Sequence, residues 1–318
     1  MKRAALALTL LLPAAAVAQT APPPSAPIQD WSNVETVTVV APKGPAMWHI
    51  TQGASEIWIL PTIAPVPSDF TWNSDGVEDV IRGANAVYLP AELTANFWQA
   101  SWFLITGLHK IEQPDGQSLR ATLPPDLRKR FEDWLVKAGD DADDYDDYLA
   151  AIAGLRLESD YLKNTKMDGR AAIWRVSGLA EIAGLKAKPV ASYDAMPIAD
   201  EVGGLSADQE LNCMRASLDD LDTIAAHALA AAHAWSIGDI AGLKANYSEA
   251  KAYDCFNQTR TFADDRAKTI TATVNAIDES LTKPGRTVFV MELGIFLRKN
   301  GVLDRLAAQG IKVEGPPD

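Results

Sequence analysis

Residues 47–65, MWHITQGASEIWILPTIAP, hold the pattern that decides the fold. Apolar side chains alternate with others in MWHIT and again in EIWIL, which is typical of half-buried β-strands. The residues QGAS between these runs are typical of a turn, so we predict a β-hairpin. The second strand ends in ILPTIAP, and a strand end that enters a loop is a common place for a functional site. None of residues 61–64 can titrate, however, so this strand end raises the question of whether it is a site at all.

Helix and strand patterns succeed each other along the rest of the chain. Further strands are predicted at 86–93, stopped near Pro90, and at 188–194, 287–293 and 311–314. Helices are predicted at 77–84, 124–139, 206–235, 259–281 and 301–310, and residues 145–186 look helical overall. Ser206 and Gln209 form a capping-box pattern at the start of the longest helix. The order of elements predicts a mixed α/β (α+β) fold. We expect a single domain in which helices flank a central mixed β-sheet, with a large helical insertion.

The first 36 residues have the composition of a leader and a linker. Lys2 and Arg3 precede a short apolar run that ends in AVA, which predicts a signal peptide over residues 1–18 with cleavage after Ala18. Residues 19–36 are rich in proline and predict an extended linker, so the domain covers 37–318. An exported protein in the periplasm, or a secreted one, follows from this interpretation; a leader retained as an anchor is the alternative.

Charge and hydropathy argue against nucleic-acid binding and against a transmembrane span. The formal net charge is −13 and the isoelectric point is about 4.8, which argues against binding to nucleic acid. No stretch after the leader reaches 18 apolar residues, so we expect no transmembrane span. For an exported domain of this kind we expect an unknown envelope protein, or a polysaccharide or peptide ligand, as the partner.

Cys213 and Cys255 are the only cysteines. Export would place them in an oxidising compartment, where one disulfide that closes a long loop contributes about 2–4 kcal/mol. Compartment and even count favour the bridge, and two buried thiols are the alternative.

The sequence contains no local catalytic motif. It lacks GxSxG, a P-loop, GxGxxG after a strand, and HExxH. The acidic run DDADDYDD at 140–147 lacks the glycine and the terminal glutamate of a calcium loop, so we interpret it as a solvated turn before a helix. His227 and His233 lie six residues apart and do not share a helix face as an i,i+4 metal pair would.

The order of segments over about 37–314 resembles the TraB/GumN family, which also contains the Tiki metalloproteases. The segments that carry the resemblance are AMWHITQGASEIWILPTIAPVP, VEDVIRGANAVYLPAEL, EQPDGQSLRATLPPDL, LAEIAGLKAKPVASYD and TVFVMELGIFLRKNGVLDRLAAQGIKVE. In the family, the strand of the first segment ends in GTxH, the strand of the second ends in a glutamate, and a second glycine-histidine motif stands before the GVL of the last.

The resemblance implies a divalent metal held by two histidines and a carboxylate at strand ends, which would activate water for hydrolysis. In this chain the first glycine and histidine positions are Pro61 and Ala64, and the glutamate position is Pro90. The second histidine position is Ile295, although Gly294 before it is retained. Alanine, proline and isoleucine side chains offer no lone pair to a metal, so we predict no metal site and no metal cofactor.

Two functions remain open. The first is a pseudoenzyme that keeps the fold and acts by binding a ligand or an envelope partner, and the sequence favours it. The second is a hydrolase with a rearranged, carboxylate-based site. Its candidate residues are Glu92, Asp194 and Glu292 at predicted strand ends, with Arg260 or Arg266 on the helix before the last strand, because strand ends distant in sequence can meet at one crevice.

Overall fold

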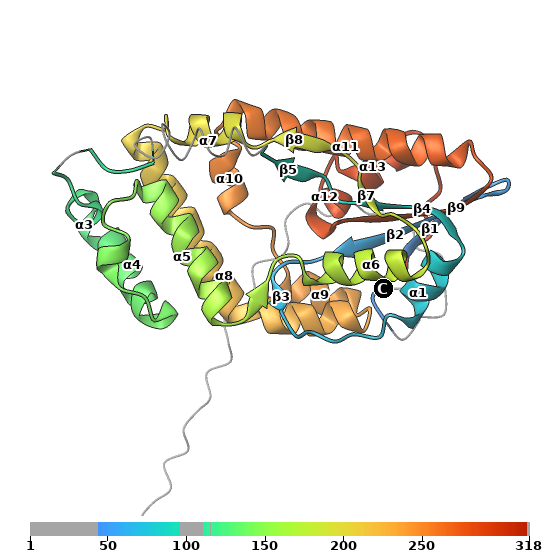
Figure 1. The fold of residues 1–318 in the computed structure, drawn as a ribbon, viewed down its shortest axis with the longest axis horizontal. Coiled ribbons are helices and arrows are strands. Elements are labelled where there is room, and N and C mark those ends of the chain that lie inside the picture. The colour runs from blue at the N-terminus through green and yellow to red at the C-terminus, as the bar shows by residue number, and fades with distance from the viewer. Residues whose placement is uncertain (1–43, 96–110, 115, 317–318) are drawn as a thin grey trace, which may run out of the picture.

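The structure is a computed structural model that describes residues 44–95, 111–114 and 116–316 (Figure 1). The predicted leader, residues 1–18, and the predicted linker, residues 19–36, lie outside these ranges. Within them the predicted fold class is confirmed, because a central mixed sheet is flanked by helices.

The central sheet has five strands in the order β1-β2-β9-β4-β7. The first two form the predicted hairpin, whose turn is made by Gly53, with φ of 60°, and Ala54. β2 pairs in parallel with β9, β9 with β4, and β4 with β7, so the carboxyl ends of four strands point the same way. The strands are β1 (Trp48–Gln52), β2 (Ser55–Thr62), β9 (Gly285–Glu292), β4 (Ala84–Leu89) and β7 (Lys188–Pro189).

Two small sheets lie beside the central one. β3 (Val66–Pro67) pairs with β6 (Met167–Asp168), and β5 (Glu92–Thr94) pairs in parallel with β8 (Ser192–Asp194). The prediction of one strand over 188–194 is therefore wrong. The segment forms two strands, β7 and β8, because its partners β4 and β5 are themselves separated at Pro90 and Ala91.

A strand over 311–314 is also wrong. Glu314 meets β1 only at one bridge to His49. The backbone N–H of Ile311 instead donates a 3.0 Å hydrogen bond to the carbonyl of Leu306, at the end of the preceding helix.

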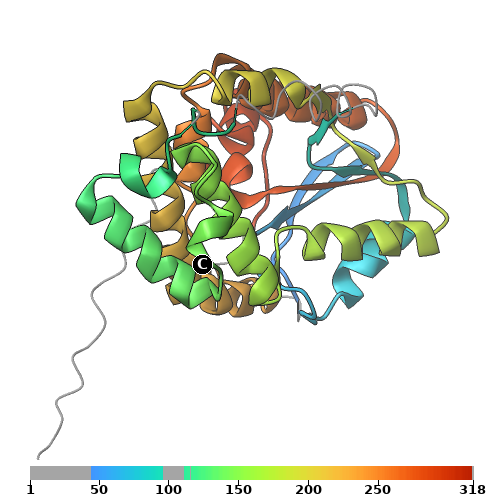
Figure 2. The same cartoon turned by 60° about the vertical axis from the view of Figure 1, so that its left-hand side comes forward.

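Helices lie on both sides of the central sheet. α1 (Asp75–Arg82) and α6 (Ala171–Ile182) run together on one side, below the sheet in Figure 2, and α11 (Arg260–Leu281) runs above it. The other helices around this part of the fold are α7 (Met196–Val202), α9 (Ile240–Asn246), α12 (Leu293–Leu297) and α13 (Val302–Ala308). No helix in the described ranges combines the length and the apolar character that a membrane crossing requires.

The predicted helical insertion packs as a second layer beside the sheet (Figure 1). It has its own apolar core around Phe131, Tyr145 and Leu218. α8 connects the two cores, because its first half packs in the insertion while Trp235, at its end, packs against the sheet. The elements of the insertion are α3 (Leu119–Thr122), α4 (Pro125–Ala138), a short 3-10 helix (Ala142–Asp144), α5 (Ala150–Asn164), α8 (Ala207–Ser236) and α10 (Ala252–Phe256).

Local interactions agree with two sequence predictions about the insertion. The capping box of Ser206 and Gln209 is present at the start of α8. Cys213 of α8 and Cys255 of α10 lie at disulfide distance, with Cα atoms 5.0 Å apart. The bridge ties α10, and the loop that leads to it from α9, to the longest helix.

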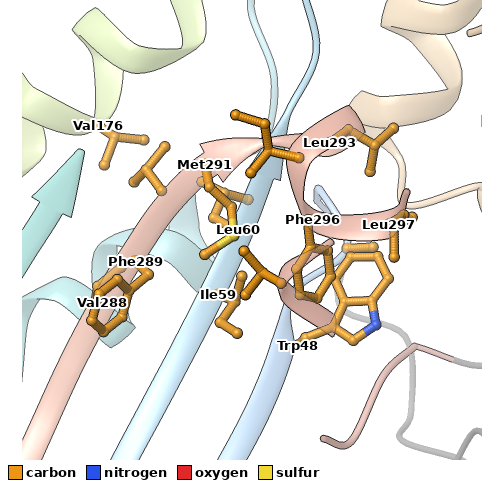
Figure 3. Packing of buried hydrophobic residues seen from close by; sticks show 14 of the residues in the cluster. Trp48, Ile59, Leu60, Val176, Val288, Phe289, Met291, Leu293, Phe296 and Leu297 are labelled. Atoms are coloured by element: carbon orange, nitrogen blue, oxygen red, sulfur yellow. The ribbon is translucent and has the colours of Figure 1, made fainter. Parts of the chain in front are cut away.

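Apolar packing fixes the two central strands where they end. Leu60 and Met291 lie beside each other on neighbouring strands, under the apolar residues of α12 (Figure 3). Phe296 of α12 meets Trp48 edge to face, with ring centroids 5.1 Å apart. Buried contacts of this kind define the positions of the residues that follow each strand.

Candidate functional site

The carboxyl ends of the four parallel strands open onto one pocket of about 520 Å³. Its lining includes the last residue of each strand, Thr62, Leu89, Pro189 and Glu292. One face of α11 lies across these ends, and the beginning of α6 and strand β5 complete the wall. These elements contribute Phe262, Asp265, Arg266, Thr269 and Thr273 from α11, Arg170 and Ile173 from the start of α6, and Glu92 from β5. We call this the site pocket. Its volume lies within the usual range for small-molecule sites, about 300–1,000 Å³.

The positions that correspond to the metal ligands of the resembled family lie in the site pocket. Ala64, Pro90 and Ile295 all line it. Their side chains carry no donor atom for a metal ion. Within the described ranges, no three His, Cys, Asp or Glu side chains gather closely enough to hold one. The residues present therefore do not fit a metal centre of the family's type.

The two glycine positions of those motifs have different surroundings. Pro61 is buried at the end of β2, and its carbonyl accepts a 2.8 Å hydrogen bond from the indole Nε1–H of Trp235. Gly294 makes room for a carboxylate, since a Cβ there would lie 2.9 Å from Oε1 of Glu249. The retained glycine thus admits a charged side chain beside the site pocket.

Glu292 is the central polar group of the site pocket. It ends β9, directly opposite Thr62 in the register with β2. Its side chain is largely buried, and burial raises the pKa of its carboxyl group, while Arg266 opposes the change. Among the described residues, no hydrogen bond or ion pair holds this carboxylate.

A buried ion pair lies next to Glu292. The guanidinium of Arg266 on α11 contacts the carboxylate of Glu249, and Arg298 lies 3.7 Å from the same carboxylate. Burial, and then Arg298, lowers the pKa of Arg266 to about 10, so the guanidinium stays protonated at neutral pH. We refer to Glu249–Arg266 as the buried ion pair.

Two tyrosines that line the site pocket feel the charge of Glu292. The charge of Glu292, followed by burial, raises the pKa of Tyr253. Burial, followed by Glu292, raises the pKa of Tyr247, whose hydroxyl faces the backbone amide of Gly294. Both phenols are therefore neutral at physiological pH, and they present aromatic rings and hydroxyl groups to the site pocket.

The structure separates the candidate residues of the carboxylate hypothesis. Glu92 lines the site pocket and accepts a 3.1 Å hydrogen bond from Oγ of Ser192. Asp194 does not line it; its Oδ1 accepts a 2.9 Å hydrogen bond from the backbone of Met196. Because the described residues contain no acidic cluster that could hold an ion, Glu92, Asp194 and Glu292 do not share one cation.

Helical phase distinguishes the two candidate arginines. The side chain of Arg260 is 90% exposed, lies 3.8 Å from Asp264, and does not line the site pocket. Arg266 is on the inner face of α11 with Phe262, and its side chain is only 9% exposed.

The lining offers apolar surface, carboxylates and hydroxyls, but its threonine hydroxyls are not paired with a base. None of the described residues that line the site pocket is a histidine, cysteine or lysine. The hydroxyls of Thr62, Thr269 and Thr273 each donate to a backbone carbonyl, at 3.3, 2.9 and 2.8 Å. A nucleophilic hydroxyl requires a base within hydrogen-bond reach, and these hydroxyls have none.

Residues 247–253 contribute three side chains to the site pocket and its buried ion pair, and the sequence alone did not predict them. Tyr247, Glu249 and Tyr253 lie in YSEAKAY, the segment that runs from the end of α9 into α10. The segment has neither helix nor strand periodicity. Its only signal is two aromatic residues and an acidic one in a stretch too irregular to form a core element.

Comparison with known proteins identifies a family that the chain matches. The family model described as the TraB/PrgY/gumN family matches residues 46–315, which include the sheet, the helical insertion and the site pocket. The chain matched no curated protein and no solved structure.

Proposed function

The chain belongs to the TraB/PrgY/gumN family, and from that premise we propose that it is an exported binding protein of the cell envelope, without metal-dependent catalysis. In this proposal a small ligand occupies the site pocket, at the place where the family's metal chemistry would stand. Export is proposed from the leader-like residues 1–18 and the linker-like residues 19–36.

The observation that carries the proposal is that the crevice is still open although its metal ligands are replaced. Ala64, Pro90 and Ile295 are short or compact enough to leave about 520 Å³ between the strand ends and α11. A domain kept only as a scaffold gains stability when side chains fill such a space. An unfilled pocket with a few converging polar groups is instead the usual form of a ligand site.

A hydrolase is the second candidate function. Glu92 and Glu292 both line the site pocket, and burial raises the pKa of Glu292, as is useful for a general acid. The absence of a histidine, cysteine or lysine among the described lining residues favours binding over catalysis.

The binding proposal is tested with protein isolated from its native compartment. Native mass spectrometry should find the wild-type chain carrying a small molecule, and Ala64→Trp, which places an indole in the site pocket, should carry none. Ala267→Trp is the matched control, because Ala267 is exposed on α11 and does not line the site pocket; it should retain the molecule.

The metal content of the purified protein is the measurement that could refute the proposal. We expect no zinc at stoichiometric level after dialysis and no change in the melting temperature on addition of a chelator. Stoichiometric zinc whose removal lowers the melting temperature would refute the proposal. Hydrolysis of a candidate peptide or polysaccharide that is lost in both Glu92→Gln and Glu292→Gln would support the hydrolase instead.

A further inference from the structure

The polar groups of the site pocket define the kind of ligand that it accepts. Glu292 is a largely buried carboxylate that lines the pocket, and no hydrogen bond or ion pair from a described residue holds it. Burying a carboxylate without a partner is costly in free energy. A ligand that brings a cation or a strong hydrogen-bond donor to this group removes that cost.

The neighbouring arginines make their ion pairs with another carboxylate. Arg266 contacts Glu249, with which Arg298 also interacts. The guanidinium of Arg266 also lies over the ring of Tyr253, 4.8 Å from its centroid. The charge of Arg266 acts on Glu292 as well and lowers the pKa of its carboxyl group, but no ion pair joins the two side chains.

The other carboxylates that line the pocket already have partners. Asp265 accepts a 2.9 Å hydrogen bond from Nζ of Lys268, and Glu92 accepts the hydrogen bond from Ser192. Glu292 is therefore the carboxylate on which a ligand's positive group gains most.

The walls of the pocket indicate the rest of the ligand. Ile63, Leu89, Ile173, Phe262 and Phe289 give it a broad apolar surface. This surface suits an aliphatic or aromatic body, because removing apolar area from water contributes about 25 cal/mol for each Å². The ring of Tyr247, which also lines the pocket, suits a cation, because a cation is attracted to the face of an aromatic ring. Tyr253 already has the guanidinium of Arg266 over its ring.

We propose that the site pocket binds an amphipathic amine, whose ammonium group pairs with Glu292 near Tyr247 while its apolar body lies along the strand ends and α11. The inference rests on the proposed binding function. An anionic ligand is disfavoured, because three carboxylates line the pocket against two arginines, of which Arg266 is engaged with Glu249 and Arg170 lies over the ring of Trp174.

The test uses three probes that share one apolar body and differ in the head group: 4-phenylbutylamine, 4-phenylbutan-1-ol and 4-phenylbutyrate. Calorimetric titration of the mature wild-type protein at pH 7.5 should give the tightest binding for the amine and the weakest for the carboxylate. Glu292→Gln should weaken amine binding by about tenfold to a hundredfold, as expected when a charged hydrogen bond is lost. The same change should alter the affinity for the alcohol by less than about threefold.

Asp264→Asn is the matched control for charge. It removes one negative charge from the outer, exposed side of α11, and amine affinity should stay within about twofold of wild type. An equal loss in Asp264→Asn and Glu292→Gln would show a general electrostatic effect and overturn the assignment to Glu292.

The outcomes separate this inference from the proposed function. If the three probes bind equally, or the butyrate binds tightest, and Ala64→Trp blocks all of them, the ligand class is wrong while the binding function stands. Failure of the amine to bind also overturns the ligand class. If Ala64→Trp leaves binding of every probe unchanged, the pocket is not the binding site and both proposals fail.

Discussion

Glu158 of α5 is a carboxyl group in an unfavourable position, and its replacement should stabilise the protein. Its Oε2 is fully buried and has no hydrogen-bond partner among the described residues. Burial, and then the charge of Asp220, raises its pKa from 4.5 to about 7. Burial raises the pKa of Asp220 as well, while the two 2.7 Å hydrogen bonds that its carboxylate accepts from the backbone amides of Lys251 and Ala252 oppose the change.

The magnitude follows from that pKa. At about 1.36 kcal/mol for each pKa unit, the ionised form of Glu158 reduces the free energy of unfolding by about 3 kcal/mol. Between pH 4.5 and 7 the folded protein binds more protons at this site than the unfolded chain does, so stability falls as the pH rises. The full penalty is present above pH 7 and disappears below pH 4.5. Glu158→Gln, which cannot ionise, should therefore stabilise the protein by about 3 kcal/mol at pH 8 and by less than about 1 kcal/mol at pH 5.

Urea unfolding followed by far-UV circular dichroism at pH 5 and pH 8 measures this difference. Glu132→Gln is the control, because Glu132 is exposed on α4, and it should change stability by no more than about 0.5 kcal/mol at either pH. The reasoning is refuted if Glu158→Gln is no more stable than wild type at pH 8. A gain of equal size at both pH values would also refute it, because the effect would then not arise from ionisation.

Three further changes test the interactions that hold the site in place. Replacing Cys213 and Cys255 together by serine should lower the free energy of unfolding by about 4 kcal/mol, from the entropy of a loop that spans 42 residues; an unchanged urea midpoint under non-reducing conditions would show that the bond does not form. Trp235→Phe removes the hydrogen-bond donor of the Pro61 carbonyl and should reduce stability by about 1–3 kcal/mol in urea unfolding, whereas a neutral result would show that another donor replaces the indole. Gly294→Ala places a Cβ 2.9 Å from the carboxylate of the buried ion pair and should lower stability by about 1–3 kcal/mol, and a melting temperature equal to that of wild type would contradict this contact.

The central part of the fold was predictable because its strands show a clear periodicity. β1, β2 and β9 alternate or are continuously apolar, and their burial in the sheet follows that pattern. The long helix α8 was predictable from its capping box and its apolar stripe. The strand predictions for residues 188–194 and 311–314 were wrong because strand pairing also depends on partners distant in sequence and, for 188–194, on where a proline interrupts the ladder.

The candidate site was predictable only in part. The rule that parallel strands end at one edge of a sheet correctly brings Glu92 and Glu292 to one pocket. The choice between Arg260 and Arg266 required the rotational phase of α11, which the structure supplies by placing Arg266 on the inner face with Phe262. The burial of Glu158 was equally unpredictable from the sequence, since a glutamate in a helical pattern is normally exposed and only the packing of α8 against α5 buries it.

The energetics of the site pocket favour the proposed binding role over a purely structural one. Residues without a donor atom stand at the ligand positions of the resembled family and need no space for a metal, and filling an apolar cavity is one of the simplest routes to greater stability. Instead, Ala64 and Ile295 leave the space open, and Glu292 places inside it a largely buried carboxylate that no hydrogen bond or ion pair from a described residue holds. Both features reduce stability, and stability is normally sacrificed in this way at sites that bind or react. If Glu292→Gln stabilises the free protein but weakens its binding of the amine, the two effects together would show that this carboxylate serves the ligand and not the fold.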